Sequence, residues 1–153
     1  MGNTEKKLKE AIEALNGGNY QISFDVFKPL AEQGNAKAQF HLGFLYRIGQ
    51  VVEQDYQQAY HWYLLSAEQG YAVAQYKIGL MHYKGQVVDK NYQKAFKWYS
   101  LAAEQGDPKA QFNLGVLYRR AQGVTQDHEK ALTWFLAAGE QGYALAQFTL
   151  GGI

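Results

Sequence analysis

Apolar residues recur along this chain in two alternating helical patterns, and the pair of patterns returns every 36 residues. The first pattern, AKAQFHLGFLYRI at 36–48, places Ala38, Leu42 and Leu45 on one face at helical spacing. The second, DYQQAYHWYLLSA at 55–67, is amphipathic in the same way. Counterparts of the first pattern lie at 72–84 and 108–120, and those of the second at 91–103 and 127–139. A fixed period of this length indicates stacked supersecondary units, here pairs of antiparallel helices.

The predicted helix ends carry matching signals in every copy. Side-chain oxygens that can accept free first-turn amides precede the second helix at Asp55, Asn91 and Asp127. A glycine suited to the left-handed position after a helix stands at Gly34, Gly70, Gly106 and Gly142. Asp107-Pro108 combines an N-cap with proline at the first helical position. The sequence therefore predicts an all-α fold with a 36-residue period.

We expect one repeat domain over residues 1–153. Residues 4–30 fit the frame as a capping helix pair, whose first helix carries an apolar stripe and an otherwise polar surface. Three repeats follow at 31–66, 67–102 and 103–138. Residues 139–153 begin a fourth repeat that stops in the middle of its first helix. Two interpretations remain, a fragment of a longer array, which we favour, or an improvised cap.

Each unit reads roughly A-Q-[FY]-x-[LI]-G-x-x-[YH], a loop, and then [DN]-[YH]-x-x-A-x-x-W-[YF]-x-x-x-A-E-Q-G. This pattern resembles the Sel-one-like repeat (SLR) family, a relative of the tetratricopeptide repeats, over residues 31–153. The loops depart from the family form G-x-G-V. The first two read GQVV at 49–52 and 85–88, and the third reads AQGV at 121–124. Because valine tolerates positive φ badly, we expect the first two loops to differ from the third.

Membership of this family would imply a right-handed α-solenoid that serves as an adaptor or scaffold for other proteins. Family members act in signalling, protein quality control and contacts between bacteria and host cells. A cysteine-rich bacterial branch is linked to penicillin binding, but this chain has no cysteine.

Comparison of the internal copies separates architecture from specificity. The recurring Trp62, Trp98 and Trp134 could form ligand platforms, but their repetition favours a place in the inter-helix core. Glycine inside a helix costs about 1 kcal/mol relative to alanine, so its recurrence in the first helix, as at Gly43, indicates close helix–helix contact. The recurrence of the glutamates that include Glu32 suggests hydrogen bonds between units, whereas the sequence gives no role for the repeated Gln39 position.

The variable face of the first helices is the candidate binding surface, since first helices line the concave face of a tetratricopeptide-like superhelix. Its residues are Lys37, Phe40, Phe44, Arg47, Val73, Tyr76, Leu80, Tyr83, Lys84, Lys109, Phe112, Val116, Arg119 and Arg120. The three complete first helices carry lysine and arginine but no aspartate or glutamate. We therefore hypothesise a groove for a protein segment or peptide that is acidic or ends in a carboxylate. The alternative is a solvated charged face.

Composition narrows the choice of partners. The 153-residue chain has a net charge of +1, so no global field recruits nucleic acid or acidic membranes, and no nucleic-acid motif occurs. No apolar run reaches the roughly 20 residues that a spanning helix needs. The N-terminus does not resemble a signal peptide. A cytoplasmic protein is the default, with a periplasmic or secreted one as the alternative if a leader has been removed.

No catalytic, cofactor or metal site is predicted. The serines, Ser23, Ser66 and Ser100, fall on second helices and form no S-x-x-K motif. The histidines, His41, His61, His82 and His128, show no metal-ligand spacing. The preferred function is therefore a protein-interaction module rather than an enzyme. Two alternatives stay open: a structural segment that associates end to end through residues 146–153, and a penicillin-binding or β-lactamase-like enzyme.

Overall fold

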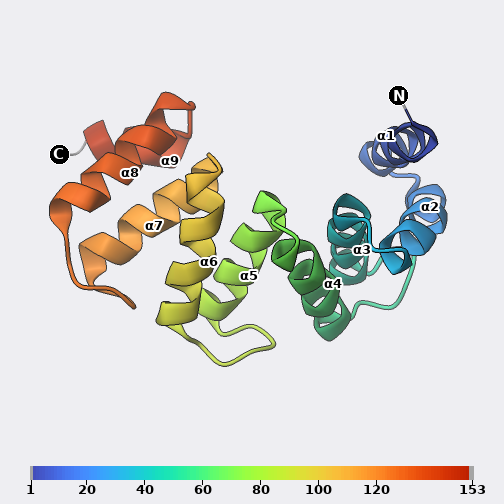
Figure 1. Cartoon of the computed structure of the whole chain (residues 1–153), viewed down its shortest axis with the longest axis horizontal. Coiled ribbons are helices and arrows are strands. Elements are labelled where there is room, and N and C mark those ends of the chain that lie inside the picture. Colours follow the sequence, from blue (N-terminus) through green and yellow to red (C-terminus); the bar gives the residue numbers. More distant parts are fainter. Residues whose placement is uncertain (1, 152–153) are drawn as a thin grey trace. The chain divides into compact units, whose positions relative to one another are not determined.

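The computed structural model describes residues 2–151 and, within them, the side chains of residues 2–149. This part of the chain is all-α (Figure 1). Its helices are α1 Asn3–Asn16, α2 Tyr20–Glu32, α3 Ala36–Ile48, α4 Tyr56–Glu68, α5 Ala72–Lys84, α6 Tyr92–Glu104, α7 Pro108–Arg120, α8 His128–Glu140 and α9 Ala144–Gly151. The chain divides into two compact units, residues 1–71 with α1 to α4 and residues 72–153 with α5 to α9. Within each unit every helix packs against the next in sequence.

The predicted helix ends are confirmed by their hydrogen bonds. Asp55 accepts from the backbone amides of Gln57 and Gln58 at 3.0 Å, which fixes the start of α4. Asn91 and Asp127 cap α6 and α8 in the same way. Helices α2, α4, α6 and α8 each end before a glycine with positive φ: Gly34, Gly70, Gly106 and Gly142. Short polar caps and left-handed glycines thus set the helix boundaries that hydrophobic spacing alone leaves open.

The repeated glycine of the first helix brings the two helices of a pair into close contact, as predicted. A Cβ built on Gly43 would lie 2.9 Å from the ring of Tyr63 in the paired helix α4. In the second unit, a Cβ on Gly79 or Gly115 would lie 2.7 Å from the rings of Tyr99 and Phe135, respectively. Any side chain at these positions would push the paired helices apart.

The central core ring is the residue that follows each tryptophan. Tyr63, Tyr99 and Phe135 are at most 2% exposed. Trp62 and Trp134 are only partly buried, although both pack against the hydrophobic core of their units. The tryptophans therefore flank the core, because the Gly–aromatic contact already occupies the centre of the helix pair.

A chain of glutamine hydrogen bonds joins successive repeats. In the first unit, Gln69 Nε2 donates at 2.8 Å to the carbonyl of Gly34 and to Oε1 of Gln39. Gln39 Nε2 in turn donates to the carbonyl of Ala31, at 3.2 Å. The end of α2, the start of α3 and the end of α4 are thereby linked through the buried amide of Gln39 and the exposed amide of Gln69. The corresponding chain in the second unit runs from Gln141 through Gln111 to Ala103.

In the repeated tetrapeptide A-E-Q-G, the glutamine and the glutamate have different surroundings. Glutamine makes the bonds between repeats, whereas the glutamates of the same tetrapeptides are exposed: Glu32, Glu68, Glu104 and Glu140. Serine hydroxyls add two bonds within helix pairs, between the second helix and the first. Ser23 Oγ donates to the carbonyl of Ala11 at 2.8 Å, and Ser66 Oγ to that of Ala36 at 2.7 Å.

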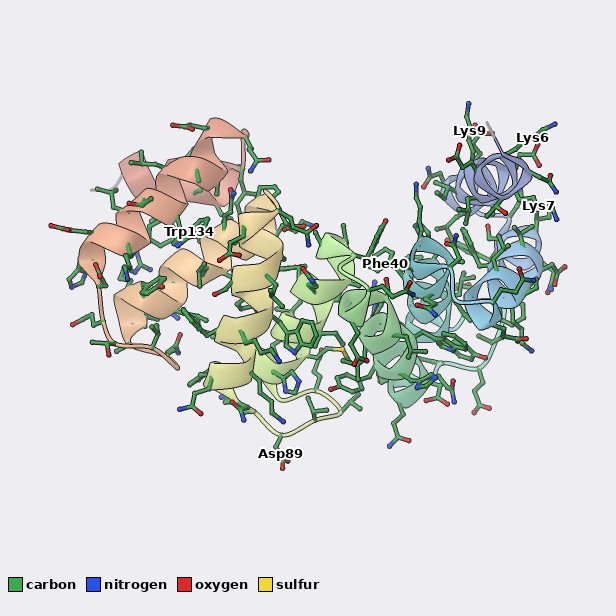
Figure 2. All side chains as sticks on the ribbon, viewed as in Figure 1. Lys6, Lys7, Lys9, Phe40, Asp89 and Trp134 are labelled. Atoms are coloured by element: carbon green, nitrogen blue, oxygen red, sulfur yellow. The ribbon has the colours of Figure 1, made fainter. Side chains whose placement is uncertain are left out.

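Helix α1 packs against the first unit through one apolar face. Leu8 and Ala11 are buried against the core, with Ile12 and Leu15 packed beside them. The charged residues of the same helix are exposed, and Figure 2 shows Lys6, Lys7 and Lys9 pointing away from the unit.

The three loops between first and second helices differ in a way that the sequence predicted only in part. Val51 keeps a negative φ and packs against the core of the first unit. Val87 instead takes a φ of 68°, close to the 73° of Gly123 in the third loop. The first loop therefore differs from the third as expected, whereas for the second loop the expectation was wrong. Glycine is required at position 123 for a second reason, because a Cβ added there would collide with the backbone carbonyl of Tyr92.

Replacing Val87 by glycine should stabilise the protein by about 1 kcal/mol, since a β-branched residue at positive φ is strained and glycine is not. Val87 is 44% exposed, so little buried surface is lost. The matched control is Val51→Gly, which removes a core contact without relieving strain and should destabilise. Urea unfolding followed by circular dichroism measures both. A Val87→Gly protein less stable than the parent would contradict the strain.

Replacing Gln111 by leucine should lower the free energy of unfolding by about 1–3 kcal/mol, because the carbonyl of Ala103 and the amide of Gln141 lose a buried partner. The control is Gln93→Leu at an exposed site on α6, for which we expect a change below about 0.5 kcal/mol. Equal effects at the two sites, measured by chemical denaturation, would show that the glutamine chain does not hold the repeats together.

Candidate binding groove

A pocket of about 320 Å³ opens between α5 and α7 of the second unit. Its apolar wall is made by Leu80, Phe112 and Val116, and the buried ring of Tyr99 on α6 contributes to it. Its charged and polar lining residues are Tyr83, Lys84, Asn113, Arg119 and Arg120. No acidic residue lines this pocket. The site thus combines an apolar surface with three cationic side chains.

Aromatic neighbours hold several of these side chains in place. The guanidinium carbon of Arg119 lies 5.4 Å from the ring centroid of Phe135, a cation–π distance. The hydroxyl of Tyr83 donates to Oε1 of Gln122 at 3.1 Å, which ties α5 to the loop after α7. Arg120 and Lys84 are exposed. One cation is therefore anchored on a buried ring, and two extend into solvent.

The buried tyrosine beneath the pocket is held in its neutral form. Burial raises the pKa of the Tyr99 hydroxyl well above its ordinary value. That oxygen makes no hydrogen bond of good geometry, and the amide of Asn113 is its polar neighbour. Tyr76 on the same face stacks on Tyr99 with 6.0 Å between ring centroids, and the pKa of Tyr76 is also raised by burial.

The first unit carries the other part of the predicted surface on α3. Arg47 lies over the ring of Phe44 at 5.3 Å. The hydroxyl of Tyr63 lies beside Arg47, whose charge opposes the rise in the Tyr63 pKa that burial causes. Lys37 lies elsewhere, in an open cleft of about 570 Å³ between α1 and α3 that Glu5, Lys9 and Glu13 also line. That cleft mixes charges of both signs, unlike the pocket of the second unit.

The recurring aromatic residue of the first helix has a structural role. Phe40 lies 5.5 Å from Tyr63, and Phe112 lies 5.4 Å from Phe135 and 5.5 Å from Tyr143, measured between ring centroids. Phe40 and Phe112 thus pack on the buried core rings of their helix pairs. Phe112 also lines the pocket, so this residue serves both packing and the candidate site.

The structure brings together one group of the sequence-predicted residues in a single pocket: Leu80, Tyr83, Lys84, Phe112, Val116, Arg119 and Arg120. Val73, Tyr76 and Lys109 belong to the same unit but lie outside the pocket lining, with Lys109 Nζ 6.0 Å over the ring of Tyr76. Sequence reasoning missed Tyr99 and Asn113. The helical register that selected Val116 could have found Asn113, because a residue three positions earlier lies on the same side of a helix.

Other chemistry has no visible basis in the part of the chain that the structure describes. No group of three histidine, cysteine, aspartate or glutamate residues there could hold a metal ion. Ser23 and Ser66 are fully buried and bonded to backbone carbonyls. None of the described helices has the length and apolar character needed to cross a bilayer.

The fold is that of an α-solenoid repeat protein, as predicted. The Sel1 repeat family matches residues 36–71, 72–107 and 108–143, so the same period is read in a frame five residues later than ours. Most of the chain is covered, and the chain belongs to the Sel1 repeat family. Proteins of this family are generally scaffolds for protein interactions, and the fold is a non-catalytic interaction fold.

Solved structures support the assignment. A Sel1 repeat protein from Oxalobacter formigenes is 35% identical, with a TM-score of 0.79, and the match covers 83% of this chain and 96% of that one. A protective antigen with an SLR fold, from uropathogenic Escherichia coli strains, is 34% identical over 98% of this chain, with a TM-score of 0.89. An immunity protein from Pseudomonas aeruginosa is 25% identical over 98% of this chain, with a TM-score of 0.69. The chain spans 33% of the antigen's length and 56% of the immunity protein's. No curated protein sequence matches significantly.

Stability should fall on acidification because of His41. Its ring stacks on Phe27 at 4.8 Å, its Nε2 is buried without a hydrogen-bond partner, and burial together with the nearby Lys37 lowers its pKa from 6.5 to about 4. Between these values the unfolded chain binds more protons, so stability is complete above pH 6.5 and declines as the pH falls towards 4. The loss should reach about 3 kcal/mol.

The control variant is His41→Asn, which takes the residue of the equivalent position, Asn113. The difference in unfolding free energy between parent and variant should shrink with falling pH, measured by urea denaturation from pH 7 to 4. Carboxylates and His82, whose pKa burial also lowers, act in both proteins and cancel in this difference. A difference that does not change with pH would contradict a neutral, buried His41.

Proposed function

We propose that this protein is an interaction module that holds an acidic segment of another protein in the groove of its first helices. The observation that carries the proposal is the pocket between α5 and α7, in which an apolar wall faces Lys84, Arg119 and Arg120 with no acid among the lining residues. Arginine and aromatic residues are enriched where proteins bind tightly. A planar guanidinium matches a carboxylate through two parallel hydrogen bonds.

The chemistry of the partner follows from the lining. A carboxylate, from aspartate, glutamate or a chain end, would meet the cations. A neighbouring leucine or similar side chain would cover Leu80, Phe112 and Val116. Phe40, Phe44 and Arg47 of the predicted surface belong to the first unit and do not line this pocket. The family's general role as a scaffold supports a protein partner over a small metabolite.

A second candidate function is self-association through α8 and α9. The observation that favours it is a set of exposed apolar side chains on these helices: Leu132, Leu136, Leu145 and Phe148, at 41%, 45%, 55% and 83% exposure. Exposed apolar surface of this kind is typical of an interface. Sedimentation of the parent and of Leu136→Glu distinguishes this candidate, because association through the patch should be lost in the variant alone.

The groove proposal predicts that a fluorescent peptide of alternating leucine and glutamate binds the protein. Arg119→Ala combined with Arg120→Ala should weaken binding at least about tenfold. Raising the salt from about 0.05 to 0.5 M should weaken binding to the parent more than to this variant. The matched control is Lys94→Ala with Lys97→Ala, which removes two exposed cations of α6 that lie outside the pocket lining. Fluorescence anisotropy measures all arms, and equal losses in the two double variants would overturn the proposal.

A further inference from the structure

Two arginines occupy the same position of the first helix but have different neighbours. Arg47 on α3 and Arg119 on α7 are separated by two periods. The second helix contributes the facing core ring, which is Tyr63 in the first case and Phe135 in the second. The two copies can therefore be compared directly, because the same arginine faces a ring with a hydroxyl in one copy and a ring without a hydroxyl in the other.

Arg47 is enclosed by its own repeat. Phe44 lies against its guanidinium at 5.3 Å, and the hydroxyl of Tyr63 lies beside it. Arg47 Nε and the Tyr63 hydroxyl oxygen are both buried, and neither makes a hydrogen bond of good geometry. The Tyr63 hydroxyl is therefore the polar neighbour of Arg47, and the ring of Phe44 lies against the guanidinium.

Arg119 has different neighbours from Arg47 at both of these positions. The residue that corresponds to Phe44 is the smaller Val116, which lines the pocket together with Arg119. The residue that corresponds to Tyr63 is Phe135, whose ring supports the guanidinium at 5.4 Å and offers no oxygen to its N–H groups. The arginine is held in one orientation while its donors stay available to a ligand.

We infer that Phe135 and Val116 leave the guanidinium of Arg119 free to bind a carboxylate of the partner in the groove. Arg47 has no such role. This inference rests on the proposed function and assigns it a specificity-determining residue. Arg119 supplies the oriented fork, so lysine cannot replace it. The exposed Lys84 and Arg120 act through charge alone and accelerate encounter with an acidic segment.

The test uses the signals of the arginine Nε–H groups in nitrogen-15 NMR spectra of the full chain. A peptide of alternating leucine and glutamate should shift the Arg119 signal and leave that of Arg47 unchanged. The same peptide with glutamine in place of glutamate should shift neither. Phe135→Tyr restores the ring of the other two repeats and so should fold normally. It should weaken peptide binding about tenfold, as should Arg119→Lys, whereas Arg120→Lys should bind like the parent.

A second measurement needs no ligand. The Nε–H of Arg119 should exchange with water faster than that of Arg47, and Phe135→Tyr should slow it. Tyr63→Phe combined with Phe44→Val should speed exchange at Arg47. If the acidic peptide binds but Phe135→Tyr changes neither affinity nor exchange, the inference fails and the proposed function stands. If the peptide shifts no signal of the parent at millimolar concentration, both fail.

Discussion

The contact between a glycine of the first helix and an aromatic ring of the second determines most of this structure. Gly43, Gly79 and Gly115 each lie within 3 Å, measured from an added Cβ, of the ring they face. The glycine gives up about 1 kcal/mol of helix propensity, and in return a large ring is buried completely between two closely packed helices. Because the separation of the helices is fixed in this way, the same kinds of cap and glutamine bond recur at the same places in the copies. At this contact the copies differ only in the hydroxyl of the ring, which is present on Tyr63 and Tyr99 and absent from Phe135.

Much of the fold follows from the sequence because its determinants are local and repeated. Periodicity, caps such as Asp55 and terminal glycines such as Gly34 each depend on a few neighbouring residues, and repetition makes each signal visible several times. The glutamine chain could not be foreseen, because Gln39 and Gln69 meet across residues that are far apart in sequence. The tryptophan position was read correctly as repeating, but only the packed structure shows that its neighbour Tyr63 takes the centre of the core.

The candidate site was predictable to a different degree. Helical register identified which face of α5 and α7 is free, since that question concerns one helix at a time. It could not show that Arg47 and Arg119 differ, because the difference lies in the facing residues Tyr63 and Phe135 on other helices. Nor could it separate Lys37, which lines a cleft of mixed charge, from the cations of the apolar pocket. Electrostatic character depends on neighbours, and neighbours are set by tertiary packing.

The requirements for packing and for binding fall on different atoms, so a repeat protein can acquire a binding site without loss of stability. The core ring at position 135 needs volume and burial, and phenylalanine meets both requirements as well as tyrosine does. Removing a hydroxyl that makes no good hydrogen bond costs little, because in the tyrosine copies that oxygen is buried without adequate compensation. Under the proposed function, the same removal leaves Arg119 free to bind a carboxylate of the partner. A substitution that is nearly neutral for packing can thus decide binding, provided that it lies one layer beneath the exposed face.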